Sequence, residues 1–133
     1  MKTKSIKTLY VAAVLTSALG TLALTSGCIA VAAGAGAGTV AYVTGELKAT
    51  VEANLDRTEA ATNRAIADLQ FAKVSEKRDA LTATIIARTA EDKKVEIHIE
   101  GATQTTSTVK IRVGWVGNEA VSLKILDQIK SHL

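Results

Sequence analysis

The strongest constraint on the fold is the alternation of apolar and polar residues in segments 81–88, 94–100 and 109–115. A period of two places the apolar side chains on one face of a β-strand and the polar ones on the other. Strands that are wetted on one face are typical of antiparallel sheets. Residues 90–93 form a polar break of hairpin length between the first two segments. The alternation therefore predicts an antiparallel sheet whose apolar face another layer must cover.

Two segments with helical periodicity can supply that layer. Residues 54–70 carry an apolar stripe behind an N-cap at Asn54 or Asp56, and a second amphipathic segment follows an N-cap at Asn118. Residues 46–52 alternate as a further strand, and residues 71–78 are expected to form a short one. The predicted order is β-α-β-β-β-β-α. This is an α+β two-layer sandwich with a mainly antiparallel sheet of four to five strands and both helices on one face.

The other face of the sheet is expected to carry a mixture of acids and bases. Its predicted members are Glu46, Lys48, Arg88, Lys94, Glu96, His98, Lys110 and Arg112. Cross-strand pairs of opposite charge account for such a mixture without a ligand. His98 lies between Glu96 and Glu100 at strand spacings of about 7 Å, so these three side chains could bind a divalent metal. We favour a solvated sheet face, and assign no metal, cofactor or catalytic residue.

The N-terminal segment has the parts of a bacterial export signal. Three lysines precede an uncharged apolar stretch, residues 9–24, and small residues follow it. The run from Thr25 to Cys28 is similar to the lipobox of bacterial lipoproteins, with Thr25 where leucine is usual. That resemblance implies cleavage between Gly27 and Cys28 and a diacylglycerol thioether on Cys28. A buried free thiol and an uncleaved anchor extending to Val43 are the alternatives.

Cleavage would change the charge of the chain. The full sequence has 16 basic and 13 acidic residues, and removal of the three signal lysines leaves 13 of each. A neutral mature chain lacks the excess positive charge that phosphate binding needs, so no nucleic-acid partner is expected. The single cysteine excludes an internal disulfide and a cysteine-based zinc cluster.

Composition divides the chain into three parts. Residues 1–27 are the predicted lipoprotein signal peptide, residues 28–44 the lipidated cysteine and a tether rich in Ala and Gly, and residues 45–133 the α+β domain. The default for an uncharged Ala/Gly run is a flexible tether. Small residues four apart in this run also fit a stripe for close packing of membrane helices, which stays open as an alternative.

Few side chains offer chemistry downstream of the cysteine. No Ser-His-Asp set can be assembled around His98 or His132, and His132 at a helix C-terminus is explained by the helix dipole. Trp115 falls on the apolar face of its predicted strand, so we expect it in the core. The alternative is that Trp115 lines a small-ligand pocket between the helices and the sheet.

Three stretches together carry a resemblance to a known family. They are residues 40–49, 86–95 and 111–119, the last leading into Ile125 and Ile129. With the lipobox-like segment ahead of them, nearly the whole chain resembles a domain-of-unknown-function family of small bacterial lipoproteins, the DUF3568-like proteins. Asn118 stands where that family usually has Asp. The resemblance implies an envelope lipoprotein, and it implies no activity, substrate or catalytic residue.

These features predict a non-enzymatic lipoprotein of the bacterial cell envelope that serves as a structural or interaction module. Its membrane contact is expected through lipid on Cys28, with an envelope protein as a further partner. Ile29 follows the cysteine, where Asp would resemble an inner-membrane retention signal. In a Gram-negative host this favours the periplasmic side of the outer membrane. The small-ligand binding domain near Trp115 is the second hypothesis.

Overall fold

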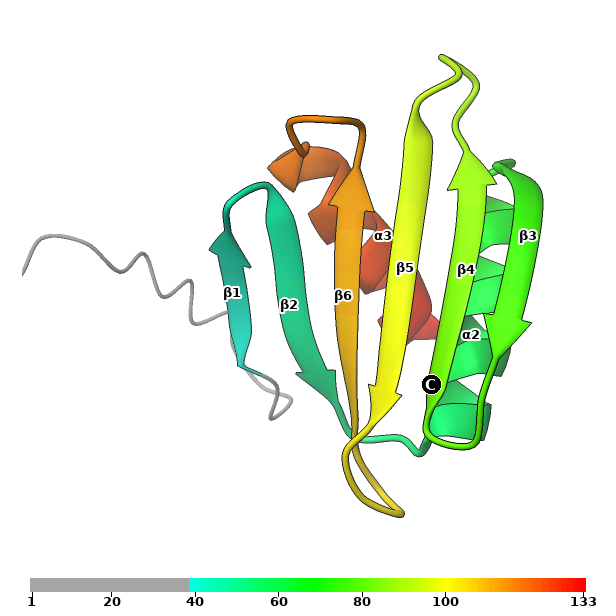
Figure 1. The fold of residues 1–133 in the computed structure, drawn as a ribbon, viewed down its shortest axis with the longest axis vertical. Coiled ribbons are helices and arrows are strands. Elements are labelled where there is room, and N and C mark those ends of the chain that lie inside the picture. The colour runs from blue at the N-terminus through cyan, green and yellow to red at the C-terminus, as the bar shows by residue number, and fades with distance from the viewer. Residues whose placement is uncertain (1–38) are drawn as a thin grey trace, which may run out of the picture.

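A computed structural model describes residues 39–133 of the chain, which fold into one six-stranded sheet backed by two helices (Figure 1). All neighbouring strands are antiparallel, in the order β1-β2-β6-β5-β4-β3. The strands are β1 (Val40–Val43), β2 (Glu46–Val51), β3 (Ala72–Arg78), β4 (Thr82–Arg88), β5 (Lys94–Gly101) and β6 (Ser107–Val113). The antiparallel sheet expected from the alternation is confirmed.

Both helices lie on the same face of the sheet and pack against each other. Helix α2 (Leu55–Asp68) covers β3, β4 and β5, and helix α3 (Glu119–Ser131) covers β2 and β6. Each begins at a predicted asparagine. The side-chain oxygen of Asn54 accepts a hydrogen bond from the backbone N–H of Arg57 at 3.0 Å, and that of Asn118 from Val121 at 3.1 Å. The α+β two-layer sandwich is therefore confirmed.

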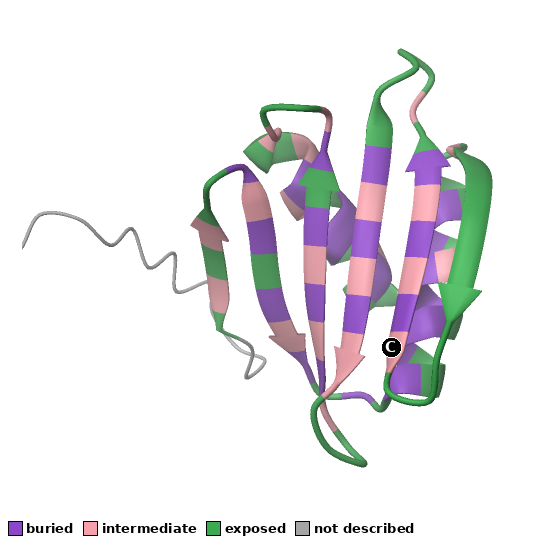
Figure 2. Cartoon of the chain, viewed as in Figure 1, coloured by how far each residue is buried: buried purple, intermediate pink, exposed green. Residues whose placement is uncertain are grey.

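The core follows the alternation strand by strand, as the banding in Figure 2 shows. Every second residue of β4, β5 and β6 is buried against the helices, while the residues between them face outward. The inward-facing side chains of these strands are aliphatic throughout except Ser107. Because one face of each strand is fully buried, a register shift of one residue would expose this whole apolar set.

The predicted strand count was too low because β1 was missed. Val40–Val43 pairs with β2 through a two-residue turn at Thr44 and Gly45, in the segment that we expected to belong to the tether. Both turn residues have positive φ, 54° and 81°, the pattern of a hairpin turn that matches strand twist. The run of four apolar residues shows no alternation, and threonine is an unusual residue for such a turn. Neither the periodicity nor the turn signal therefore revealed β1.

Candidate functional site

The predicted lipidation and cleavage residues, Cys28 and Gly27, lie outside the described residues, as does most of the tether. What the structure describes is the domain that follows them. None of the helices among residues 39–133 has the length and apolar character needed to cross a membrane. Three regions of this domain gather unusual side chains: the open face of the sheet, the edge strand β3 and the loop after β6.

The first region is the open face of the sheet around His98. The Nδ1 atom of His98 lies 2.8 Å from the hydroxyl of Thr84, and its Nε2 atom lies 3.2 Å from a carboxylate oxygen of Glu100. The same oxygen accepts a hydrogen bond from the ammonium group of Lys110 at 2.7 Å, which lowers the pKa of Glu100. Each polar group thus has a partner on the neighbouring strand, as expected for a solvated sheet face.

Glu96, His98 and Glu100 share this face but do not converge on one point. Glu96 pairs instead with Lys94, whose Nζ atom lies 3.0 Å from its carboxylate. Among residues 39–133 no group of three His, Cys, Asp or Glu side chains is placed to hold a metal ion. The predicted cross-strand pairing of opposite charges holds only in part: Glu46 and Glu96 both lie opposite Arg112, but Lys48 lies opposite Lys110 and Arg88 opposite Lys94.

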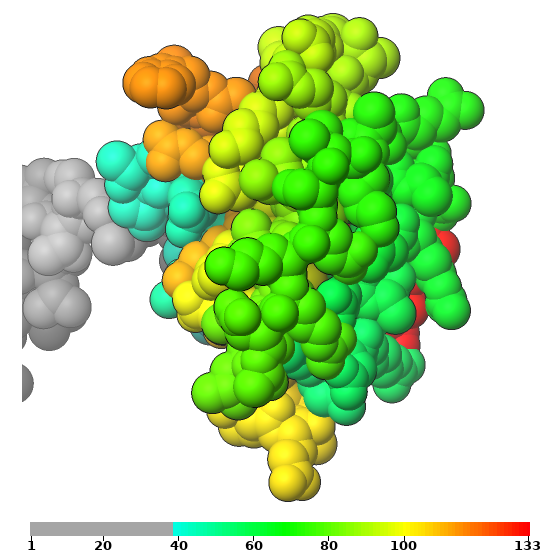
Figure 3. All heavy atoms as spheres, turned by 45° about the vertical axis from the view of Figure 1, so that its right-hand side comes forward, coloured from blue at the N-terminus to red at the C-terminus, as the bar shows by residue number. Residues whose placement is uncertain are grey.

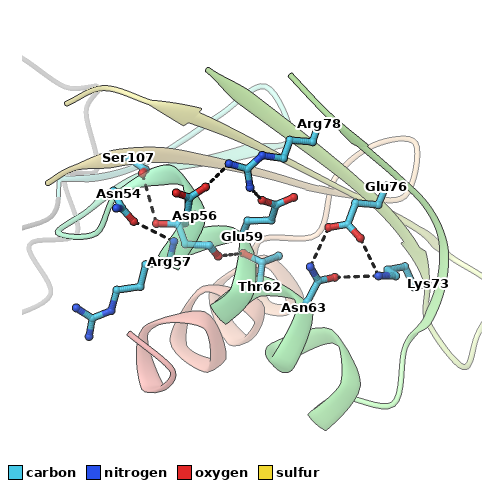
Figure 4. A network of polar contacts seen from close by, with 11 residues as sticks. Asn54, Asp56, Arg57, Glu59, Thr62, Asn63, Lys73, Glu76, Arg78 and Ser107 are labelled. Atoms are coloured by element: carbon cyan, nitrogen blue, oxygen red, sulfur yellow. Dashed lines mark hydrogen bonds and ion pairs between the residues drawn. The ribbon is translucent and has the colours of Figure 1, made fainter. Parts of the chain in front are cut away.

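The second region joins the edge strand β3 to helix α2 (Figure 4). The guanidinium group of Arg78 donates hydrogen bonds to the carboxylates of Asp56 and Glu59. Glu59 is buried, and this loss of water raises its pKa, although the positive charge of Arg78 opposes the rise. No signal in the sequence marks this cluster, because Arg78 and Glu59 meet only when β3 has paired with β4.

A second polar group lies beside the first in Figure 4. Glu76 accepts hydrogen bonds from the side-chain amide of Asn63 at 2.9 Å and from Lys73 at 2.8 Å, and the bond from Lys73 lowers its pKa. An open groove of about 380 Å³ runs past the Arg78 end, between the start of α2 and the loops at that end of the sheet. The paired charges of Arg78 with Asp56 and Glu59, and the bond from Asn63 to Glu76, fasten β3 to α2.

The third region is the loop after β6, and it overturns the prediction for Trp115. The indole is 94% exposed, so Trp115 is neither in the core nor in the wall of an interior pocket. Strand β6 ends at Val113, and Gly114 follows with a φ of 72°. The left-handed conformation of Gly114 interrupts the alternation of faces along the strand. The alternation therefore no longer predicts which face Trp115 occupies.

Trp115 belongs to an exposed apolar corner, which we define as Val43, Trp115 and Val116. Their exposed fractions are 67%, 94% and 81%. Two glycines bring the corner together, because the loop after β6 rests directly on the β1–β2 turn. A Cβ atom on Gly117 would lie 2.3 Å from the carbonyl oxygen of Gly45, and one on Gly45 would lie 2.2 Å from that of Val116. Figure 3 shows the loop, in orange, standing out above the start of the sheet, in cyan.

His132 has a more specific partner than the helix dipole that we expected. Its Nε2 atom lies 2.6 Å from the carboxylate of Asp68, at the end of α2. Gln128 donates a second hydrogen bond to the same oxygen at 3.0 Å. These bonds lower the pKa of Asp68 and join the ends of the two helices.

Comparison with known proteins adds a family but no activity. The model of a family described as "Protein of unknown function (DUF3568)" matches residues 8–132. No curated protein matches the chain.

Proposed function

Since the chain belongs to the DUF3568 family of proteins of unknown function, we propose its role from its own residues: it is a lipid-anchored protein of the bacterial cell envelope. Its domain works there as a non-enzymatic structural or interaction module. The observation that carries this proposal is the position of Cys28. The only cysteine of the chain stands directly behind a basic region, an uncharged apolar stretch and three small residues.

The lipid on Cys28 would fix where the domain acts. One acyl chain gives only reversible membrane binding, whereas two give stable anchoring. A diacylglyceryl cysteine carries two chains. The domain would therefore remain at its membrane, on the periplasmic side of the outer membrane in a Gram-negative host, because Ile29 is not an inner-membrane retention residue.

The domain itself supports a module better than an enzyme. An active site needs a base, nucleophile or metal held by converging groups around space for a substrate. In residues 39–133, the polar side chains around His98 and Arg78 are engaged with one another in pairs across neighbouring elements. Such pairing supports a stable scaffold that presents its surface to a partner.

Metabolic labelling with a fatty-acid analogue tests the anchor. The wild-type chain should be labelled and Cys28→Ala should not, because no other cysteine is available for a thioether. Ser26→Ala is the matched control, since it keeps a small residue in the same segment and should keep the label. An unlabelled wild type, or equal label in Cys28→Ala, would contradict the proposal.

The interaction role can be tested separately by cross-linking in intact cells. A module should give a reproducible cross-linked product that contains an envelope protein. His98→Ala should leave this product and the cellular phenotype unchanged, because the histidine only completes a surface network. A phenotype that His98→Ala abolishes while the chain stays folded and labelled would favour an enzyme.

A further inference from the structure

The exposed apolar side chains of the domain are concentrated at one place. Five large hydrophobic residues are exposed among residues 39–133, and three of them, Val43, Trp115 and Val116, form the apolar corner. The other two, Val74 and Leu81, lie on β3 and before β4, at the far edge of the sheet. A gathered patch with the largest side chain most exposed marks a contact surface more than scattered residues do.

The corner is held in position by backbone contacts. Gly45 and Gly117 approach so closely that neither has room for a Cβ atom, and both have positive φ. The guanidinium group of Arg112 also donates a hydrogen bond to the carbonyl oxygen of Trp115 at 3.2 Å. The backbone of the loop is therefore tied to the β1–β2 turn and to β6, and it presents the exposed indole at this corner.

The path of the chain places this corner close to the proposed anchor. Only eleven residues separate Cys28 from Val40, where β1 begins, and β1 ends three residues later at Val43 in the corner. The chain from Cys28 to Val40 spans at most about 40 Å when fully extended. The bilayer that holds the lipid is thus never far from the corner. This raises the effective concentration of membrane surface at the corner.

We propose that the apolar corner inserts into the interfacial layer of the same bilayer to which Cys28 is attached. The proposal rests on the lipid anchor proposed above. Tryptophan is enriched at this depth of membranes, because its ring is apolar while its N–H reaches the headgroups. The two valines would add apolar surface beside the ring. The corner would then act as a second, weak attachment that sets the orientation of the sheet on the membrane.

A second copy of the chain fits this corner less well. A stable protein interface needs about 800 Å² from each partner. An aromatic side chain can bury about 150–250 Å², and the two valines add less than a second ring would. A bilayer has no such minimum area, because the lipid on Cys28 already provides stable attachment.

The charges near the corner indicate that the lipid headgroup matters little. Arg112 is an exposed cation beside Trp115, but Glu46 and Glu96 lie opposite it on the two neighbouring strands. With Lys94, which pairs with Glu96, this gives two cations and two carboxylates, so there is no local excess of positive charge to attract anionic lipid. Insertion should therefore occur in zwitterionic as well as in anionic vesicles.

The single tryptophan of the chain makes the test direct, because all indole emission comes from Trp115. The full lipidated chain is reconstituted into phosphatidylcholine vesicles with or without brominated acyl chains, which quench indoles at short range. We expect brominated vesicles to lower the emission about twofold, since interfacial insertion reaches the acyl boundary. The same ratio is expected when half of the lipid is phosphatidylglycerol.

A relocated tryptophan provides the matched control. The double variant Trp115→Leu and Leu81→Trp moves the only indole to an exposed position at the opposite end of the sheet, and keeps an apolar residue in the corner. Its emission should be equal in both kinds of vesicle. Quenching that is equal for wild type and double variant would overturn the proposal, since it would report only general proximity to lipid.

Flotation of the same vesicles separates the two proposals. A chain that floats with the vesicles but shows no bromine quenching would overturn the inserted corner and leave the anchor standing. Protection of Trp115 from aqueous acrylamide that grows with protein density, without bromine quenching, would instead identify a second copy at the corner. A chain that does not float would overturn the anchor and the insertion together.

Discussion

The two edge strands of the sheet are protected by different means. β3 carries lysines and an arginine, has a register shift between Lys73 and Ser75, and is fastened to α2 by paired charges. β1 has only four residues and no charged side chain. The turn that follows it is held by the close backbone contact between Gly45 and Gly117. Charges and bulges on an edge prevent pairing with other chains. The β3 edge is therefore protected against pairing with another strand by charge and by its register shift, whereas the β1 edge lies beside an exposed apolar corner.

The largest effect should come from disturbing the β1 side at Gly117. Gly117→Ala would place a Cβ atom 2.3 Å from the Gly45 carbonyl oxygen and would also strain a residue with a φ of 92°. We expect a loss of about 3 kcal/mol in the free energy of unfolding, measured by urea denaturation followed by far-UV circular dichroism.

Gly114→Ala separates the steric effect at Gly117 from that of the backbone conformation. Gly114 has a φ of 72°, but a Cβ atom there would meet nothing within 4 Å. Its replacement should cost only about 1 kcal/mol, the penalty for a left-handed residue. Equal losses for the two variants would show that the close approach of the two backbones is not what holds the corner.

The β3 side should respond to pH. Arg78→Ala removes the cation that opposes the rise in the pKa of Glu59, so this buried carboxylate titrates at still higher pH. An acid with a raised pKa in the folded state stabilises the protein below that pKa, and the stabilisation is lost as the pH rises through it. The variant should therefore be destabilised most at neutral pH and least near pH 4, as thermal melts across this range would show.

Glu59→Gln provides the control for that dependence. It removes the titrating group, so the double variant Arg78→Ala and Glu59→Gln should lose most of the extra pH dependence. If the double variant keeps the profile of Arg78→Ala alone, Glu59 is not the buried charge that the arginine compensates.

The helices beneath the two edges differ in how they satisfy buried hydroxyl groups. In α2, which lies beneath β3 and β4, Thr58 and Thr62 both donate hydrogen bonds to backbone carbonyls. Ser122 of α3 is fully buried, and its hydroxyl oxygen has no partner among the described residues. Ser122→Ala should stabilise the protein by about 1 kcal/mol, because it removes an unpaired buried polar group and improves helix propensity.

Thr62→Ala serves as the matched substitution in the other helix. The hydroxyl of Thr62 donates to the Thr58 carbonyl at 2.7 Å, so its removal loses a bond and buried methyl contacts. Chemical denaturation should show a gain for Ser122→Ala and a loss for Thr62→Ala. A loss in both variants would mean that Ser122 has a partner in solution.

The features that the sequence predicted are local ones. Asn54 and Asn118 cap their helices through bonds that span three residues, and the alternation in β4, β5 and β6 places each side chain by its own strand. These signals need no knowledge of the tertiary structure. The layers, the residues at which the helices begin and the polar face could therefore be predicted from the sequence.

The features that the sequence did not reveal depend on contacts between distant segments. Gly45 meets Gly117 only after β2 and β6 have paired, and Arg78 meets Glu59 only after β3 has joined β4. Trp115 was misplaced because alternation was extended past the left-handed Gly114, where the strand ends. The candidate corner thus required the tertiary structure, although its glycines mark it in the sequence.

The smallest effect concerns the two non-glycine residues with positive φ that adjoin the edge strands. Thr44 follows β1 with a φ of 54°, and Gln70 precedes β3 with a φ of 57°. A β-branched side chain tolerates this conformation worse than an unbranched one, whereas asparagine adopts it readily. Thr44→Asn should therefore raise the free energy of unfolding by about 0.5 kcal/mol, and would create the Asn-Gly pair preferred in such hairpins.

Gln70→Asn tests whether that gain belongs to the β1 turn. Gln70 follows Leu69, the C-cap of α2, and the N–H of Phe71 donates to the Ile66 carbonyl at 3.0 Å, so the positive φ of Gln70 completes a helix cap. Because glutamine is unbranched, its replacement should gain less than Thr44→Asn, and hydrogen exchange should slow only in the β1–β2 hairpin of the Thr44 variant. Equal gains at both positions would show that the gain comes from the tolerance of asparagine for positive φ and not from the β1–β2 turn.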